Sequence, residues 1–531
     1  MIKENINDYH NNIRIFKKIY LSITFICFTL QLFLSETFGD YYIVTILLVL
    51  NILSVNYCFN THYYNKFPIS YIVVFFSISC LLSGSLIFKT LEFENISSGL
   101  FLPIHSTNIL FICSLIILLT HYIYIKKESK NKKDSFFFLI NQKLKLFDQK
   151  PNFLMAFGSI AIILLFVSRY LYKFGESTNT LETGWPIWYS IITGLSVFYL
   201  LPFFLIFSKK LFKKNYNINY SILLIFFVLL LMTSIGSNRR YIIFFGLVNI
   251  LMIFLILFLL GRMNFNKKSI LKYVLLIIIF LSMYEHIVKF NYVYVFERGQ
   301  AEKRTFSENI TSFKDSLFKY FYSEDSSYYM MRVEKIINTS YSDYYKNSFF
   351  LRLNYFEYAD NILYNNKVFF SHEDVKEIRS YQFNRIIGIF PQPLINLFTN
   401  NFDKKDYQFV NTASKINNKF NPNYASSNDF GSFIGEGYLM FGFFFFLLLP
   451  LICLIYFYLL DSFFHKINGV FSPILLVSLF HYSLNLGTIF ASASLDVLIF
   501  NSRVLIQMIF FYKIFEIFYK YINRLNSGNK N

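Results

Sequence analysis

Charged side chains are scarce in this sequence. Only 15% of the 531 residues are Asp, Glu, Lys or Arg, whereas 55% are hydrophobic. Soluble domains usually carry about 25% charged residues, so the composition excludes an ordinary soluble protein and places most of the chain in a lipid bilayer. Aromatic residues make up 21% of the chain, a fraction that lipid-facing helices can accommodate.

Cysteine is also scarce, and it avoids polar loops. Each of the five cysteines lies within or at the end of an apolar run, so a disulfide framework and zinc-type spacing are both excluded. The sequence also lacks a GxxxxGK[ST] loop, a GxGxxG after a strand, and a DxD-like pair in any outer loop. We therefore predict no cofactor and no metal.

Long apolar runs recur along the chain, each close to the length of about 20 residues that spans a membrane. We predict about twelve such spans, so the expected fold class is an all-α polytopic membrane protein. The polar N-terminus has no small-residue cleavage site after the first run, which is therefore expected to be a retained helix and not a signal peptide. The predicted spans are 19–36, 41–59, 68–88, 102–125, 152–172, 186–207, 218–236, 241–260, 269–290, 436–460, 471–491 and 499–519.

Lys and Arg concentrate in alternate loops, as the positive-inside rule requires. If both termini are cytoplasmic, the basic segments 126–150, 209–214 and 262–268 lie inside. The outer loops 35–40 and 175–184 contain acids and no Lys or Arg. Much of the net charge of +18 is therefore topological, and it gives no support to nucleic-acid binding.

One long polar segment, 291–435, separates the ninth and tenth spans, and the predicted topology places it outside. It divides the chain into an N-terminal membrane bundle (1–290), a large extracytoplasmic loop (291–435) and C-terminal membrane helices (436–531). Amphipathic patterns in this loop predict a small helical cap packed on the membrane part, and not an independent sheet domain. The patterns span 312–321, 326–338 and 373–388.

One short outer loop breaks the charge rule. The segment GSNRR at 236–240 carries Arg239 and Arg240. Ser237 or Asn238 could cap the following helix, whose free N–H groups would add partial positive charge beside the arginines. This combination predicts a phosphate or pyrophosphate site at the outer membrane surface. In the alternative interpretation, the arginines extend to lipid headgroups.

Other ionisable residues are predicted at the same depth, on different spans. Charged groups near membrane depth usually face a cavity and mark function. Several cations with few acids indicate an anionic ligand. The predicted binding residues are Arg169, Arg298, Arg304, Arg503 and His105.

The pattern resembles the O-antigen and capsule repeat-unit polymerases (Wzy type) of bacterial envelopes, which have many spans and one large outer loop before the last helices. The stretch GSNRRYIIFFGLVNILMIF (236–254) resembles the Ser/Arg-containing start of the family's central helix. FPQPLINLF (390–398) is similar to its Pro-containing loop segment. NYASSNDFGSFIGEGYLMFGFFFFLLL (423–449) is similar to its small-residue stretch followed by Gly-Glu-x-Tyr. The resemblance covers residues 220–460.

The resemblance implies a GT-C-like fold and a polymerase in the bacterial cytoplasmic (inner) membrane. Such an enzyme binds two undecaprenyl-pyrophosphate-linked glycans and moves the growing chain onto the nonreducing sugar of a new repeat unit. The implied partners are these glycans, membrane lipids and a chain-length regulator protein. Negative charge grows on the leaving pyrophosphate, and arginines stabilise it. Arg239 and Arg240 match that position of the family.

The acceptor hydroxyl needs a general base or close positioning. Glu436, in the Gly-Glu-x-Tyr segment at the outer membrane boundary, is the first candidate for the base, and Asp429 is the second. Glu436 could instead be a carboxylate that a helix N-terminus stabilises.

Two other functions remain open. An O-antigen ligase of the related type uses a histidine in the large loop; here only His372 is available, without the glycine-spaced motif. A lipid-linked oligosaccharide flippase or other transporter often has related halves and discontinuous helices near the midplane. Here the halves look unlike and the polar groups cluster outside.

Overall fold

The computed structural model describes most of the chain, and the statements below refer to these residues. They are 6–60, 62–130, 135–148, 150–171, 187–237, 241–263, 293, 297, 304–322, 355–368, 371–388, 390, 392–397, 402–403, 407, 412–420, 431–479, 486, 489–492 and 495–528.

The described chain is almost entirely helical, and the protein is an all-α membrane protein with several membrane-capable helices. Six helices are long and apolar enough to cross a membrane, and a bent helix pair makes a seventh if it counts as one span. The six are Asp8–Leu34, Phe38–Cys58, Pro103–Lys130, Pro151–Tyr170, Gly194–Leu211 and Phe433–Asp461; the bent pair is Pro68–Leu81 with Ser83–Leu91.

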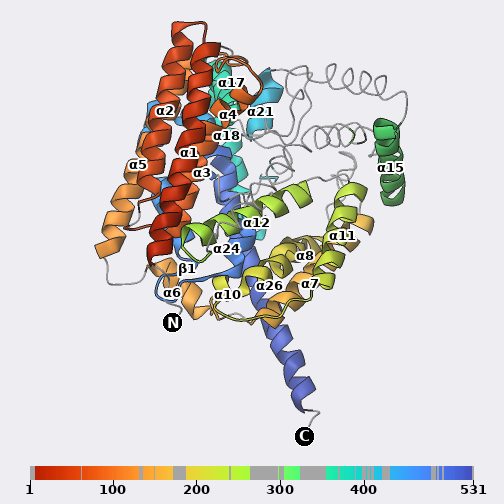
Figure 1. Cartoon of the computed structure of the whole chain (residues 1–531). Helices are drawn as coiled ribbons and strands as arrows, with labels where there is room; N and C mark the ends of the chain where they lie inside the picture. The colour runs from red at the N-terminus through yellow and green to blue at the C-terminus, as the bar shows by residue number, and fades with distance from the viewer. Residues whose placement is uncertain are drawn as a thin grey trace. The chain divides into compact units, whose positions relative to one another are not determined.

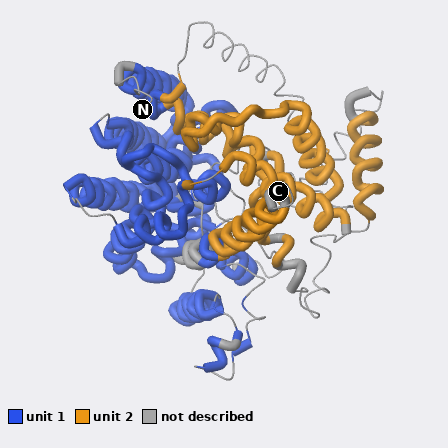
Figure 2. Tube along the Cα trace, turned by 90° about the horizontal axis from the view of Figure 1, so that it is seen from below, with its two compact units in different colours: residues 1–147, 259–261, 353–506 blue, residues 148–258, 262–352, 507–531 orange. Residues whose placement is uncertain are grey.

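The chain divides into two compact units, and each combines segments from distant parts of the sequence (Figure 2). Unit 1 comprises residues 1–147, 259–261 and 353–506, and unit 2 comprises 148–258, 262–352 and 507–531. The segment 291–435 therefore contributes to both units.

Unit 1 contains most of the membrane-capable helices. In Figure 1, α1, α2 and α5 lie side by side, and α23 packs against α5. Its elements are α1 (Ile6–Leu34), α2 (Phe38–Cys58), α3 (Pro68–Leu81), α4 (Ser83–Leu91), α5 (Pro103–Lys130), α6 (Phe136–Lys143), α17 (Tyr355–Val368), α18 (His372–Ile387), α19 (Gln392–Ile395), α21 (Thr412–Phe420), α22 (Phe433–Phe441), η5 (Gly442–Phe444), α23 (Phe445–Asp461), the antiparallel strands β1 (Phe464–His465) and β2 (Val470–Phe471), α24 (Pro473–Ser478), α25 (Ile489–Ser492) and the start of α26 (Leu495–Gly528).

The predicted span 68–88 is not one straight helix. It bends by 43° between α3 and α4. Polar side chains from three segments meet at this break: the Tyr20 hydroxyl lies 3.0 Å from both Asn51 Oδ1 and Ser79 Oγ, and Ser83 bonds to Asn51. Polar groups inserted at a helix break are a common cause of such bends.

Unit 2 has shorter, more broken helices. Its elements are α7 (Pro151–Leu171), α8 (Ile187–Ser196), η2 (Val197–Leu200), α9 (Leu201–Phe204), η3 (Leu205–Phe207), α10 (Ser208–Leu211), α11 (Tyr220–Gly236), α12 (Tyr241–Leu259), whose last residue lies in unit 1, α15 (Phe306–Tyr322) and the end of α26. The predicted span 186–207 is thus a series of short α and 3-10 turns. Pro202 lies in this series against Gly158 of α7, where an added Cβ would come within 2.2 Å of Pro202 Cδ.

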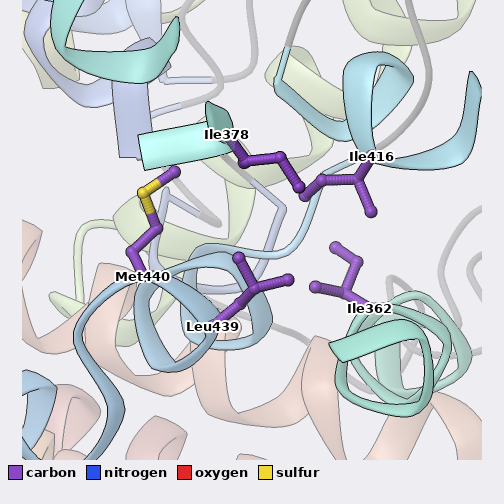
Figure 3. Close-up of a cluster of buried hydrophobic side chains, with 5 residues drawn as sticks. All are labelled: Ile362, Ile378, Ile416, Leu439 and Met440. Atoms are coloured by element: carbon purple, nitrogen blue, oxygen red, sulfur yellow. The ribbon is translucent and has the colours of Figure 1, made fainter. Parts of the chain in front are cut away.

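Helices from the segment 291–435 pack on α22, which belongs to the membrane-capable helix Phe433–Asp461. Figure 3 shows a buried cluster in which α17, α18 and α21 each supply one isoleucine and α22 supplies Leu439 and Met440. The predicted helices 312–321 and 373–388 correspond to α15 and α18. The pattern at 326–338 lies outside the described residues, as does the predicted span 269–290.

Candidate functional site

Four of the predicted site residues lie outside the described residues. These are Arg239, Arg240, Arg298 and Asp429. Their roles remain predictions, and the described residues show only the helices that lead to them.

The predicted topology places the C-terminal ends of α7 and α11 outside, and we call this region the outer end of unit 2. Phe306, the first residue of α15, contacts both of these helix ends. Its ring centroid lies 5.5 Å from that of Tyr170, at the end of α7. An added Cβ at Gly236, the last residue of α11, would come within 2.4 Å of the Phe306 ring. Asn309 Nδ2 donates to the Gly236 carbonyl at 3.1 Å.

This arrangement brings the last turn of α7, which carries Arg169, close to the end of α11. Arg169 lies in the last turn of α7 and is 5% exposed. Ser237 follows Gly236 and leads directly to Arg239. Ser237 is the C-cap of α11, and its hydroxyl donates to the Thr233 carbonyl. The described hydrogen bond of the Ser237 hydroxyl is therefore made to α11, the helix that precedes it.

Arg304 is held by an acid. Arg304 forms an ion pair with Glu297, which is 6% exposed and also accepts hydrogen bonds from Ser312 and Ser316. The charge of Arg304 is thus already balanced within unit 2. An ion pair of this kind orders the chain before α15 and reduces the attraction of Arg304 for an external anion.

The remaining predicted residues belong to unit 1. Glu436 lies in the first turn of α22 and is 0% exposed. The ring of His105, in the first turn of α5, lies 6.3 Å from that of Tyr438, two residues after Glu436. Arg503 lies in α26 and is partly buried. Glu436 and His105 are therefore on neighbouring helices, at the ends that the predicted topology places outside.

We call this region the outer end of unit 1; it includes the C-terminal ends of α1 and α4 and the N-terminal ends of α2 and α5. Its main anchor, Asp360 of α17, was not predicted from the sequence. The Asp360 carboxylate accepts from Phe101 N at 2.6 Å, Leu102 N at 3.0 Å and Ser106 Oγ at 2.6 Å. Asp360 is 0% exposed, and it binds the two residues before α5 and the Ser106 hydroxyl from a helix far away in the sequence.

A buried lysine adds a second connection between α17 and the membrane helices. Lys89 Nζ of α4 lies 2.7 Å from Glu94 Oε2 and 3.1 Å from Glu357 Oε1 of α17. The side chain of Lys89 is 9% exposed and that of Glu357 is 20% exposed. Gly99, with φ +79°, brings the loop close to this pair: an added Cβ would lie 3.5 Å from Glu357 Oε1.

Sequence reasoning missed this second connection, although a signal was present. Lys89 directly follows the predicted span 68–88, so the predicted topology places it outside. It was a second exception to the charge rule, with Glu92 and Glu94 beside it. Burial raises the pKa of Glu357, although Lys89 opposes the shift. Burial also raises the pKa of Asp360, by more than its hydrogen bonds lower it.

Among the described residues, no group of three or more His, Cys, Asp or Glu side chains is placed to hold a metal ion. The described polar groups instead form two sets of different character. The set in unit 2 contains Arg169 at the end of α7 and the Arg304–Glu297 ion pair before α15, and the set in unit 1 contains the acids Glu94, Glu357, Asp360 and Glu436 with Lys89.

No protein-family model, curated protein or solved structure matches the chain.

Proposed function

We propose that the chain is a polymerase that joins undecaprenyl-pyrophosphate-linked oligosaccharide repeat units into O-antigen or capsular polysaccharide. In this proposal it is a GT-C-like glycosyltransferase with about twelve spans. It acts on the outer side of the bacterial cytoplasmic membrane and has cytoplasmic termini and an extracytoplasmic cap. It needs no metal or cofactor from the cytosol, because its donor arrives on a lipid.

The observation that best supports this proposal is the convergence of α7 and α11 at Phe306. The convergence brings the last turn of α7, with Arg169, beside the residue from which the chain continues to Arg239 and Arg240. Helix C-termini carry partial negative charge. A pyrophosphate would be repelled there unless arginines outweighed that charge.

We assign the leaving pyrophosphate to Arg239 and Arg240, with Arg169 as their partner. Arg304 contributes less to binding because Glu297 already balances its charge. As the glycosidic bond to the lipid pyrophosphate breaks, negative charge grows on the leaving oxygen. Fixed cations lower the barrier because they interact more strongly with this transition state than with the bound substrate.

The test replaces Arg239 and Arg240 together with Ala and measures the glycan length profile in cells. We expect polymer synthesis to fall by about 100-fold or more, while single repeat units still form on the carrier. Arg262→Ala is the matched control, because Arg262 is another unit 2 arginine and donates to the Lys210 carbonyl. Unchanged chain length in the double variant would refute the pyrophosphate assignment.

Glu436→Gln tests the proposed base. A catalytic carboxylate predicts a larger loss of turnover than of substrate binding, measured with lipid-linked repeat units in membranes. Unchanged turnover would make Glu436 a structural group of the α22 N-terminus. The topology is tested separately: a reporter fused after residue 350 should be extracytoplasmic, and a cytoplasmic signal would contradict the proposed orientation.

A deletion strain separates polymerase from ligase. Without a polymerase, single repeat units should still reach the final acceptor, whereas without a ligase, long chains should accumulate on the lipid carrier. The second result would replace the polymerase with an O-antigen ligase or another lipid-linked glycosyltransferase.

One observation favours a transporter as the second candidate. The 43° bend between α3 and α4, with Tyr20, Asn51, Ser79 and Ser83 at the break, is a feature of discontinuous transporter helices. Purified protein in sealed vesicles would distinguish the candidates. A flippase moves lipid-linked repeat units across the bilayer without changing their length, whereas a polymerase lengthens them.

A further inference from the structure

The loop between α4 and α5 presents aromatic rings to the surface beside the acids of unit 1. Phe101 stacks on Tyr364 of α17, with ring centroids 4.4 Å apart and an interplanar angle of 15°. Phe101 nevertheless remains 56% exposed, and Phe93 is 80% exposed. The stack therefore fixes the orientation of the Phe101 ring without covering it.

Phe101 is held in place from both sides. Its backbone N–H donates to Asp360 at 2.6 Å, and its ring lies on Tyr364, one helical turn further along α17. Replacing the side chain leaves the backbone bond intact. The ring of Phe101 can thus be changed without removing the bond that anchors the loop.

One face of α17 carries both acidic side chains and the tyrosine on which Phe101 stacks. Glu357, Asp360 and Tyr364 are spaced by three and four residues, so they share a face of the helix. A rise of about 1.5 Å per residue places Glu357 and Tyr364 about 10 Å apart along the axis. In Figure 1, α17 lies beside α4, and the two helices are in contact.

The charge of this surface favours the neutral part of a glycan. Glu94 and Glu357 share one lysine, Lys89, and their side chains are 45% and 20% exposed. Carboxylates accept hydrogen bonds from sugar hydroxyls, and flat aromatic faces pack against the C–H faces of sugar rings. The excess of acid disfavours pyrophosphate.

We propose that the α4–α5 loop and α17 form a binding platform for the sugar of the acceptor repeat unit, with Phe101 as the stacking surface and Glu357 as a hydroxyl acceptor. This inference rests on the proposed polymerase function. It assigns the outer end of unit 1 to the acceptor glycan.

The competing explanation is that Phe93 and Phe101 anchor the protein at the membrane interface, where aromatic residues are common. The two explanations require different properties of the side chain. Interface anchoring predicts that the Phe101 ring has no effect on the binding of a glycan. Stacking needs a flat ring, which tyrosine retains and leucine lacks.

The test compares Phe101→Leu and Phe101→Tyr in the full chain in lipid nanodiscs. The probe is the oligosaccharide released by mild acid from lipid-linked repeat units that accumulate in cells lacking this protein. Binding is measured by saturation-transfer NMR. We expect Phe101→Leu to weaken binding by roughly tenfold, Phe101→Tyr to bind as the wild type does, and Glu357→Gln to weaken binding as well.

Binding of the probe by Phe101→Leu with wild-type affinity would overturn the platform, and so would failure of the wild type to bind it. Thermal unfolding curves, measured with a dye that reacts with exposed thiols, check that the variants are folded. The proposed function fails separately, if the Arg239 and Arg240 double variant still makes long chains. Weakened binding in Phe101→Leu alongside such a result would support a glycan-binding surface on a protein that is not a polymerase.

Discussion

Replacing Asp360 with alanine should destabilise unit 1 substantially. The carboxylate receives three hydrogen bonds, from two backbone N–H groups and Ser106 Oγ, and it is fully buried. A typical intramolecular bond contributes about 1 kcal/mol net, so the lost bonds amount to about 3 kcal/mol. Removing a buried charge recovers part of this cost, because burial raises the pKa of Asp360 and thus disfavours its ionised form.

The five cysteines supply the assay for Asp360→Ala. All are unpaired thiols of unit 1; Cys27, Cys58, Cys113 and Cys453 are buried, and Cys80 is partly buried. A dye that reacts with exposed thiols therefore reports the unfolding of this unit. A loss of at most about 3 kcal/mol in a unit of about 300 residues should lower the apparent midpoint by up to about 5 °C.

Two variants control the Asp360 experiment. Asp360→Asn keeps the shape and one acceptor oxygen without the charge, so its midpoint should fall between those of the wild type and Asp360→Ala. Glu373→Ala removes an exposed acid from the first turn of α18 and should have little effect. If Asp360→Ala unfolds at the same temperature as Glu373→Ala, the argument that Asp360 anchors the start of α5 is refuted.

Three further predictions concern other contacts. The hydrogen bond from Lys419 lowers the pKa of Asp374 to about 2. The stabilisation is therefore present above the unfolded pKa of about 4 and disappears as pH falls towards 2. The unfolding midpoints of Lys419→Ala and the wild type should converge at low pH, and a difference that stays constant with pH would contradict this. Gly236→Ala should displace the Phe306 ring, at about 1–3 kcal/mol, and shorten the glycan. Its control is Gly246→Ala, whose added Cβ would meet Leu200 Cδ2 at 3.2 Å and Tyr199 atoms at 3.9 Å or more. Equal glycan lengths in the two variants would argue against the α11–α15 contact. Asp461→Ala removes the acceptor of Ser70 N and the Tyr124 hydroxyl, both at 3.0 Å, so it should lower the thiol-dye midpoint more than Asp461→Asn, which keeps one acceptor oxygen; equal midpoints would contradict a role for that oxygen.

The straight membrane helices follow closely from the sequence. The predicted spans 41–59, 102–125 and 152–172 correspond to α2, α5 and α7. These helices could be predicted because a local run of apolar residues determines each of them. Their ends differ from the predicted ends by one to five residues, most at the C-terminal end of α5, where flanking polar residues continue the helix to Lys130.

The breaks and the capping contacts could not be read from local sequence. The bend after Leu81 depends on Tyr20 and Asn51, which belong to other helices. Asp360 bonds to residues 254 to 259 positions earlier in the chain, and no periodic pattern indicates that pairing. Lys89 was accessible to prediction, because its charge lay on the outer side of the predicted topology.

The cluster shown in Figure 3 has a consequence for biogenesis. Ile362, Ile378 and Ile416 come from the segment before α22, whereas Leu439 and Met440 belong to α22 itself. During synthesis the three isoleucines emerge first, and their shared core is incomplete until the later helix is in place. The α17–α21 region would thus complete its folding only after α22 joins it, which makes residues 353–420 a poor candidate for isolated expression and couples their maturation to insertion of the C-terminal helices.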